Sequence, residues 1–491
     1  MKMYLINNDY KYAAEQMLLT MFPDERPEYP EGEMQGDRAE LELFEGKARY
    51  TAVCRLVRGG ETYIGRSTAD KKKLCDELSR SRLLQRIIKL SFYRAALASG
   101  APRPVWGALT GIRPGVLLSR LLESGMSENA ALSKFCRDNY VSEERARLCL
   151  HTARASLECR KSLEPRDICL YVGIPFCPTR CAYCSFVSQS VQRSMKLIPD
   201  YLQALYKEID ATAAVVRELG LRPIALYMGG GTPTTLSAAQ LDELCSRLEE
   251  AFDLSAVREN TVEAGRPDTI ELDKLEVLKR HGVSRVSVNP QTMEDSVLEA
   301  IGRKHTARDV IEALEKVRAV GGFEVNMDLI AGLPVDTPET FKNTLDTVLT
   351  LAPDNITVHT LALKKGSAIM LGDTPRPTAQ QVGQMLDYAC GALYGAGYEP
   401  YYLYRQKYMS GGFENVGWQR GGSENLYNIC IMEELCSIIS MGGGASTKLC
   451  CGQGRIERIF DPKYPAEYIE GIDKIISEKS RIKENLLWLT N

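Results

Sequence analysis

The sequence predicts an α/β protein whose core is an open, partial barrel of six parallel βα units, with an α+β segment before it and an accessory segment after it. From residue 167 onward, short β-branched runs alternate with amphipathic helical patterns, which is typical of a parallel sheet. The first 165 residues instead group strand-like runs with long helical runs. A hydrophobic fraction of 44% and a charged fraction of 25% indicate a compact globular chain.

The N-terminal segment, residues 1–165, is predicted to be an accessory α+β domain. Residues 10–22 have helical spacing, and residues 69–99 are predicted as a long amphipathic helix. Residues 39–50 and 51–64 are predicted as short strands around Glu45-Gly46 and Gly59-Gly60. Residues 106–114 contain two glycines and a proline, which predicts an ordered loop or a helix start.

The central segment, residues 166–377, is predicted to be the barrel. Its strands are expected at residues 168–173, 224–228, 261–264, 285–289, 325–330 and 356–361. Six units are too few to close an eight-stranded barrel, so we expect an open one with its chemistry at the carboxyl ends of the strands. Residues 378–491 begin with a predicted helix over 379–397, become rich in glycine and aromatic residues, and are expected to cover the substrate.

The charge balance offers no electrostatic surface for nucleic acid, since 61 basic and 64 acidic residues leave a net charge of −3. No apolar run approaches the ~20 residues that span a bilayer, and the first residues are too polar for a signal peptide. We therefore expect a cytoplasmic protein with no membrane span and no nucleic-acid partner.

Fifteen cysteines in a cytoplasmic protein are expected to be metal ligands, reactive thiols or small core residues. Cysteines that stand singly in apolar or helical contexts are predicted to pack in the core; they are Cys54, Cys75, Cys149, Cys245, Cys390 and Cys436. The adjacent Cys450 and Cys451 are assigned a structural role.

Cys177, Cys181 and Cys184 form a C-x3-C-x2-C run directly after the first predicted barrel strand. Thiolates select iron-sulfur clusters or zinc, and a purely structural site usually has four ligands. Here the run supplies three, which leaves one position open for a substrate or cofactor, as at the fourth iron of a [4Fe-4S] cluster. The alternative is a structural zinc knuckle completed by a distant cysteine or histidine, for which only four histidines are present.

Together with other positions, this run resembles radical S-adenosylmethionine (SAM) enzymes of the oxygen-independent coproporphyrinogen III dehydrogenase family. The further matching positions are Tyr171, residues 229–234, Glu263, Gln291, Arg303 and Asp328. Residues 106–114 and 404–418 look like the HemZ branch of that family. The resemblance implies a TIM-like partial (β/α)6 radical SAM barrel with a [4Fe-4S] cluster and SAM as cofactors.

The resemblance also implies roles for individual residues. Gly230, Gly231 and Thr232 would lie against the amino group of SAM, because glycine lets the backbone approach a ligand closely. SAM would also be bound by four residues at or after strand ends, namely Glu263, Gln291, Arg303 and Asp328. Tyr171 is assigned to the neighbourhood of the substrate.

Each of these assignments has a simpler alternative. The glycines could form an ordinary turn, Tyr171 could be a core residue, and Arg303 and Glu263 could form a surface ion pair. His305 and His359 are left outside the catalytic set, since a lone histidine is more often a packing residue.

The implied reaction removes hydrogen and carbon dioxide from the propionates of coproporphyrinogen III to give the vinyl groups of protoporphyrinogen IX, with a reductant such as flavodoxin or ferredoxin. The propionates need cationic partners, for which the sequence leaves four candidates open: Arg180, Arg266, Arg405 and Lys407.

One departure points to alternatives. The dehydrogenase branch has another cysteine two residues after the third ligand, where this chain has Ser185-Phe186; the heme-chaperone branch has phenylalanine there. A heme-binding trafficking protein, or a radical SAM enzyme acting on another tetrapyrrole or on RNA, therefore stays open.

Overall fold

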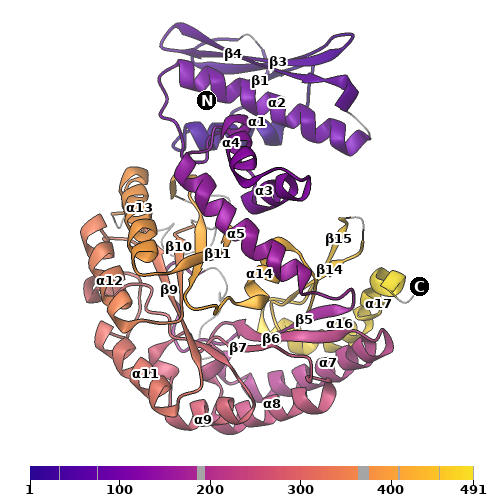
Figure 1. Ribbon diagram of the computed structural model, residues 1–491, viewed down its shortest axis with the longest axis vertical. Coiled ribbons are helices and arrows are strands. Elements are labelled where there is room, and N and C mark those ends of the chain that lie inside the picture. Colours follow the sequence, from indigo (N-terminus) through magenta and orange to yellow (C-terminus); the bar gives the residue numbers. More distant parts are fainter. Residues whose placement is uncertain are drawn as a thin grey trace. The chain divides into compact units, whose positions relative to one another are not determined.

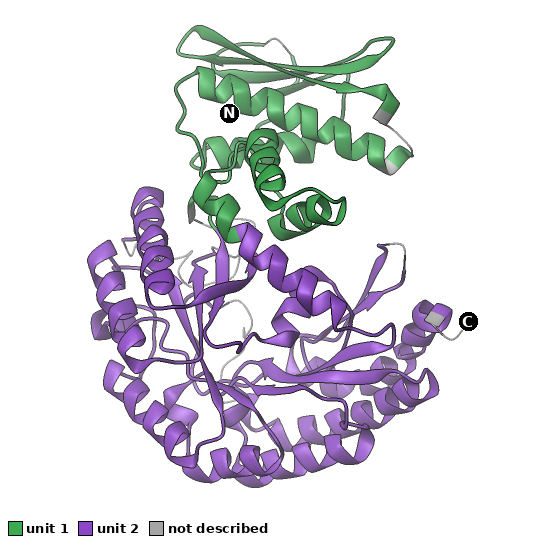
Figure 2. Cartoon of the chain, in the orientation of Figure 1, with its two compact units in different colours: residues 1–148, 411–413 green, residues 149–410, 414–491 purple. Residues whose placement is uncertain are grey.

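The computed structural model describes residues 1–32, 34–73, 76–184, 194–362, 375–406, 410–452 and 454–489. The predictions for Cys75, Ser185, Phe186 and Lys407 lie outside these residues. The chain forms two compact units, residues 1–148 with 411–413 and residues 149–410 with 414–491 (Figure 2). The division lies within helix α5 (Glu143–Lys161), earlier than residue 165.

The first unit is built on a four-stranded sheet. Its strands run in the order β1 (Lys2–Ile6), β2 (Arg38–Glu45), β3 (Arg49–Arg58) and β4 (Glu61–Asp70), with β1 parallel to β2 and the other pairs antiparallel. Helices α1 (Lys11–Met21) and α2 (Glu77–Ala98) lie along one face (Figure 1). Met17, Leu41, Ile88 and Phe92 are buried in the core between the sheet and these helices. Two shorter helices follow, α3 (Pro114–Glu123) and α4 (Glu128–Asn139).

The hairpin between β3 and β4 confirms one prediction for this unit and corrects another. The strands turn at Gly59 and Gly60, around which short strands are predicted, and these glycines adopt positive φ angles of 57° and 84°. The predicted helix over 69–99 begins only at residue 77, because β4 stays paired with β3 up to Asp70. Asp76 caps α2 by accepting a hydrogen bond from the Ser79 backbone N–H at 2.7 Å.

All six predicted barrel strands are confirmed, with bounds shifted by a few residues. They are β5 (Asp167–Ile174), β6 (Arg222–Gly230), β7 (Glu259–Val262), β8 (Arg285–Ser287), β9 (Glu324–Ala331) and β10 (Asn355–Thr360), each parallel to the next. Helices cover the outer face of this curved sheet (Figure 1): α7 (Ile198–Glu218), α8 (Ala238–Ala251), α9 (Leu272–Arg280), α11 (Ala307–Val320) and α12 (Pro338–Leu351). The short helix α10 (Asp295–Ala300) packs with residues near the strand ends. No helix in the described ranges is both long and apolar enough to cross a membrane.

The C-terminal segment extends the sheet at both edges, so the barrel stays open. After α13 (Ala379–Gly395), strand β12 (Asn415–Gln419) pairs antiparallel with β10, and β11 (Glu399–Tyr404) pairs with β12. At the other edge, β13 (Ser437–Met441) is parallel to β5, and β14 (Ser446–Cys450) and β15 (Ile456–Phe460) follow as antiparallel strands. The last helices are α15 (Pro465–Glu470), α16 (Ile472–Glu478) and α17 (Ser480–Leu486). The substrate-covering role of residues 378–491 stays a prediction.

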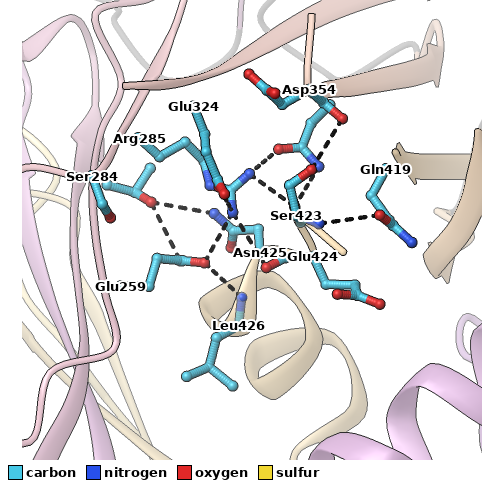
Figure 3. A network of polar contacts seen from close by, with 12 residues as sticks. Glu259, Ser284, Arg285, Glu324, Asp354, Gln419, Ser423, Glu424, Asn425 and Leu426 are labelled. Carbon is cyan, nitrogen blue, oxygen red and sulfur yellow. Dashed lines mark hydrogen bonds and ion pairs between the residues drawn. The ribbon is translucent and has the colours of Figure 1, made fainter. Parts of the chain in front are cut away.

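Helix α14 (Leu426–Glu433) and the residues before it lie inside the curve of the sheet, held at the amino ends of the strands by Arg285 (Figures 1 and 3). The guanidinium of Arg285 pairs with Glu324 at 2.6 Å and Glu259 at 3.4 Å, and donates to the Ser423 carbonyl at 3.0 Å. The same oxygen of Glu259 also accepts from the Leu426 backbone N–H at 2.8 Å. Buried charges are stable only when paired, so this network attaches the C-terminal segment to the base of the barrel.

We predict that Arg285→Met destabilises the barrel by about 3 kcal/mol or more, because it leaves the Glu259 carboxylate buried without its partner. The Arg285 side chain is only 4% exposed, so solvent does little to screen the pair. Urea unfolding followed by circular dichroism measures the loss. Arg308→Met is the control, since Arg308 is 86% exposed and its pair with Glu312 contributes little. Equal unfolding midpoints for the two variants would contradict the assignment.

Candidate functional site

The three cysteines of the C-x3-C-x2-C run lie in the loop that follows β5, and all three line one cavity of about 140 Å³. Backbone hydrogen bonds fix this loop on both sides. The Gly231 N–H donates to the Ile174 carbonyl at 2.8 Å, and the Thr232 N–H donates to the Phe176 carbonyl at 2.7 Å. Farther along the loop, the Ala182 N–H donates to the Ile301 carbonyl at 2.9 Å.

The surroundings of the thiols suit a metal cluster. Burial raises the pKa of Cys177 to about 11, although Thr232 lies 3.5 Å from its sulfur and opposes the shift. The thiol is therefore protonated at neutral pH until a metal displaces the proton. A guanidinium nitrogen of Arg266 lies 3.8 Å from the sulfur of Cys181 and places positive charge beside the thiolates that metal binding would create.

The turn after β6 forms the next wall of the cavity. Gly230 has a φ of 109°, a conformation that side chains disfavour. A Cβ at Gly231 would lie 2.5 Å from the Phe176 carbonyl oxygen, so only glycine allows the turn to pack against the cysteine loop. The Glu263 carboxylate accepts hydrogen bonds from the Gly230 N–H at 3.2 Å and from the Tyr227 hydroxyl at 2.7 Å. Burial raises the pKa of Glu263.

Arg303 forms the opposite wall. Its guanidinium donates to the Asn289 carbonyl at 3.1 Å and to the Tyr183 hydroxyl at 2.9 Å, and the residue is buried. Within the described ranges, no ion pair joins Arg303 to Glu263, and both residues line the cavity. The structure therefore differs from the simpler alternative of a surface ion pair, and it leaves both charges beside the space where a ligand would bind.

Gln291 and Asp328 connect the site to β9. The Gln291 N–H donates to the Asp328 carbonyl at 2.9 Å, and Gln291 holds a positive φ of 68°, which turns the chain after β8. The Asp328 carboxylate lies 3.8 Å from Nε2 of His359 and accepts from the Asn326 amide at 2.8 Å. Burial raises the pKa of Asp328, but the interactions with His359, Asn326 and Thr357 together outweigh burial, so the pKa is lowered.

The structure brings most of the predicted site residues to one cavity. Those that line it are Cys177, Cys181, Cys184, Gly230, Gly231, Thr232, Glu263, Gln291 and Arg303. Asp328 and Tyr171 are not part of its lining. Tyr171 instead stacks with Tyr227 and Tyr427 inside the barrel, at ring-centroid distances of 6.2 and 6.1 Å. Burial raises its pKa.

Sequence reasoning did not assign several lining residues, among them Thr179, Tyr183, Gly265 and Asn289. Gly265 directly follows the predicted strand over 261–264, and Asn289 is the last residue of the one over 285–289, so a position at a strand end could have indicated both. Tyr183 lies within the cysteine run itself.

The comparisons with known proteins agree with this geometry. Residues 171–348 match the Radical SAM superfamily. The chain is 38% identical over 387 residues, 78% of this chain and 77% of the relative, to the "oxygen-independent coproporphyrinogen-III oxidase-like protein HemZ" of Bacillus subtilis (strain 168). It is 33% identical over 236 residues, 47% of this chain and 61% of the relative, to the "heme chaperone HemW" of the same organism. Among solved structures, the coproporphyrinogen III oxidase HemN of Escherichia coli superposes with a TM-score of 0.53 at 26% identity, over 66% of this chain and 72% of that one.

The open parallel barrel and its three-cysteine loop define a radical SAM protein. Its cofactors are accordingly a [4Fe-4S] cluster and SAM. At 38% identity over most of both sequences, the chain belongs to the HemZ-type family of oxygen-independent coproporphyrinogen-III oxidase-like proteins.

We predict that Gly231→Ala lowers the iron content of the purified protein and costs about 2 kcal/mol of stability, because the new Cβ pushes the cysteine loop away from the turn. Iron and sulfide analysis after anaerobic reconstitution measures the first effect. Gly391→Ala in α13 is the control, since a Cβ there has no atom within 4 Å. If Gly231→Ala binds as much iron as this control, the packing argument is wrong.

His305 should make the apoprotein less stable in acid. Burial lowers its pKa from 6.5 to about 4, with Arg303 and Arg266 adding to the shift. The unfolded chain binds a proton below pH 6.5 and the folded chain only near pH 4, so stability falls across that window as pH decreases.

We predict that the urea midpoint of unfolding falls less between pH 7 and pH 4.5 in the His305→Gln variant than in the unchanged protein. His281→Gln is the control: burial lowers the pKa of His281, but bonds to Asp242 and Glu249 outweigh it and raise the pKa, so its contribution has the opposite sign. An unchanged decline in His305→Gln would refute the assignment.

Proposed function

We propose that this chain is a radical SAM enzyme that oxidatively decarboxylates propionate side chains of coproporphyrinogen III to the vinyl groups of protoporphyrinogen IX. The observation that carries the proposal is the convergence of three thiols, the glycine turn and Arg303 on one cavity, in a chain 38% identical over most of its length to the coproporphyrinogen-III oxidase-like HemZ. The similarity to HemN and HemW also supports the more general function, radical SAM chemistry related to tetrapyrroles.

Different residues of the cavity would bind the cluster and SAM. Cys177, Cys181 and Cys184 would each bind one iron, which leaves the fourth iron for the methionyl part of SAM. Arg303 would then pair with the methionyl carboxylate, and Glu263 would accept hydrogen bonds from SAM. When bound and reduced, the cluster and SAM supply a 5′-deoxyadenosyl radical that removes one hydrogen atom from a propionate.

The proposed reaction requires both an electron acceptor and an electron donor. After loss of the hydrogen atom, the propionate must release carbon dioxide and one electron to become a vinyl group, so a one-electron acceptor is needed. A separate reductant, such as flavodoxin or ferredoxin, would deliver the electron that the cluster uses. The expected cytoplasmic location stays a prediction.

The structure narrows the choice of cation for the propionates. Arg266 donates to Asp268 at 3.0 Å and to the Thr179 carbonyl at 3.3 Å, which assigns it to holding the cysteine loop. Arg180 lines the cavity. Arg405 follows β11, whose carboxyl end lies at the same edge of the sheet as that of β10. Burial lowers the pKa of Arg405 to about 10, which still leaves it charged at neutral pH. We therefore propose Arg180 and Arg405 as propionate partners.

A heme chaperone is the second candidate function. Two observations favour it: the chain has Phe186 two residues after the third cluster cysteine, and it is 33% identical over 236 residues to a heme chaperone. Such a protein would bind heme and keep its cluster and SAM without decarboxylation.

One experiment separates the two functions. Anaerobically reconstituted protein is incubated with SAM, a chemical reductant, an electron acceptor and coproporphyrinogen III, and porphyrins are separated by chromatography after oxidation. We predict protoporphyrin formation and 5′-deoxyadenosine release, both lost at least a hundredfold in Cys181→Ala. Cys149→Ala, which removes a buried cysteine away from the cavity, is the matched control and should stay active. Stoichiometric heme binding without turnover would replace the enzyme proposal with the chaperone.

A further inference from the structure

A second group of cysteines lies inside the barrel unit, away from the cavity described above. The sulfur atoms of Cys169, Cys430 and Cys436 all lie within 4.8 Å of one another, and all three residues are buried. The thiol of Cys159 hydrogen-bonds that of Cys430 and packs against the same cluster. These four come from four places in the fold, namely α5, β5, α14 and the turn before β13.

The spacing of three of these thiols, those of Cys169, Cys430 and Cys436, is close to that of ligands around one metal ion. Four sulfur atoms placed tetrahedrally at about 2.3 Å from zinc lie roughly 3.8 Å from one another. The Cys169 and Cys436 sulfurs are 3.7 Å apart. A disulfide would bring them to about 2.05 Å, and all four cysteines are free.

The group differs from the other buried cysteines. Among the described residues, Cys169, Cys430 and Cys436 are the one set of three or more histidine, cysteine or acidic side chains whose ligand atoms lie this close together, and Cys159 adjoins this set at Cys430. Cys54, Cys149 and Cys245 are equally buried and belong to no such set. Burial of small thiols in a core therefore does not by itself produce this convergence.

The surroundings of the group are apolar. The apolar side chains of Ile224 and Ile438 enclose the group and exclude water.

The geometry selects the class of metal. In a four-iron cube each thiolate binds a different iron, so the sulfur atoms lie farther apart than around a single ion. Four soft ligands in a tetrahedron favour a single thiophilic ion over the oxygen-seeking Mg²⁺ or Ca²⁺. A site with four protein ligands is closed, which suits a structural role.

We propose that Cys159, Cys169, Cys430 and Cys436 form a structural site for one thiophilic divalent metal ion, with Zn²⁺ as the expected occupant. The metal would join the helix that enters the barrel unit, the first barrel strand and the C-terminal segment at one point. Cys169 precedes Tyr171 by two residues on the same face of β5, so the site lies on the amino-end side of the tyrosine stack. Cys436 is buried in the core, as the sequence predicts, and the proposal adds a ligand role to that packing role.

The test uses the full chain with Cys177, Cys181 and Cys184 all changed to alanine, so that no metal signal comes from the catalytic cluster. We expect this protein, purified after growth with zinc, to contain one Zn²⁺ per chain by elemental analysis. Adding Cys430→Ser or Cys436→Ser should lower that content at least tenfold. Adding Cys149→Ser or Cys245→Ser, the matched controls, should leave it unchanged.

A second measurement does not depend on those variants folding. Replacing the metal of the cluster-free protein with Co²⁺ should give the intense sulfur-to-cobalt absorption and the visible bands of tetrahedral thiolate coordination. A chain that holds less than a tenth of an equivalent of metal and gives no such bands, or in which Cys169 and Cys436 are joined by a disulfide, would overturn the proposal. Neither result depends on whether coproporphyrinogen is the substrate.

Discussion

The contact between the cysteine loop and the glycine turn is the constraint on which the site depends. Two backbone hydrogen bonds, from Gly231 to Ile174 and from Thr232 to Phe176, hold the first two strands together beyond their ends. Because Gly231 has no Cβ, the two segments approach closely enough for the thiols and the Glu263 carboxylate to face one cavity. The remaining cavity residues reach that space from the neighbouring parallel strands, whose carboxyl ends lie at the same edge.

The opposite end of the barrel is built for rigidity. There Arg285 joins Glu259 and Glu324 to the residues that precede α14. Tyr427 of that helix stacks on Tyr227 at a centroid distance of 4.3 Å, so the packed base continues to the residues that hold Glu263. A firm base is what an enzyme needs when small displacements of cofactor and substrate alter the course of a radical reaction.

The sequence predicts features that depend on local contacts, and it does not reveal features that depend on contacts between distant parts of the chain. Local patterning predicts the six barrel strands, and Glu263 and Gln291, whose predicted roles come from the family resemblance, lie at or just after the ends of such strands. The pairing of β13 with β5 and the contact of Arg285 with Ser423 join residues more than a hundred positions apart, which no local pattern reveals. Likewise, the convergence of Cys169 with Cys436 appears only when β13 lies beside β5.

The parallel pairing of β13 with β5 has a consequence for how the chain reaches its final form. The ribosome releases β5 long before β13, so β5 waits without its outer neighbour while residues 175–436 are made. The same delay applies to β12 at the far edge and to the helix that fills the interior. The sheet therefore cannot be completed before β13 has been made, and until then its two open edges can form non-native pairings.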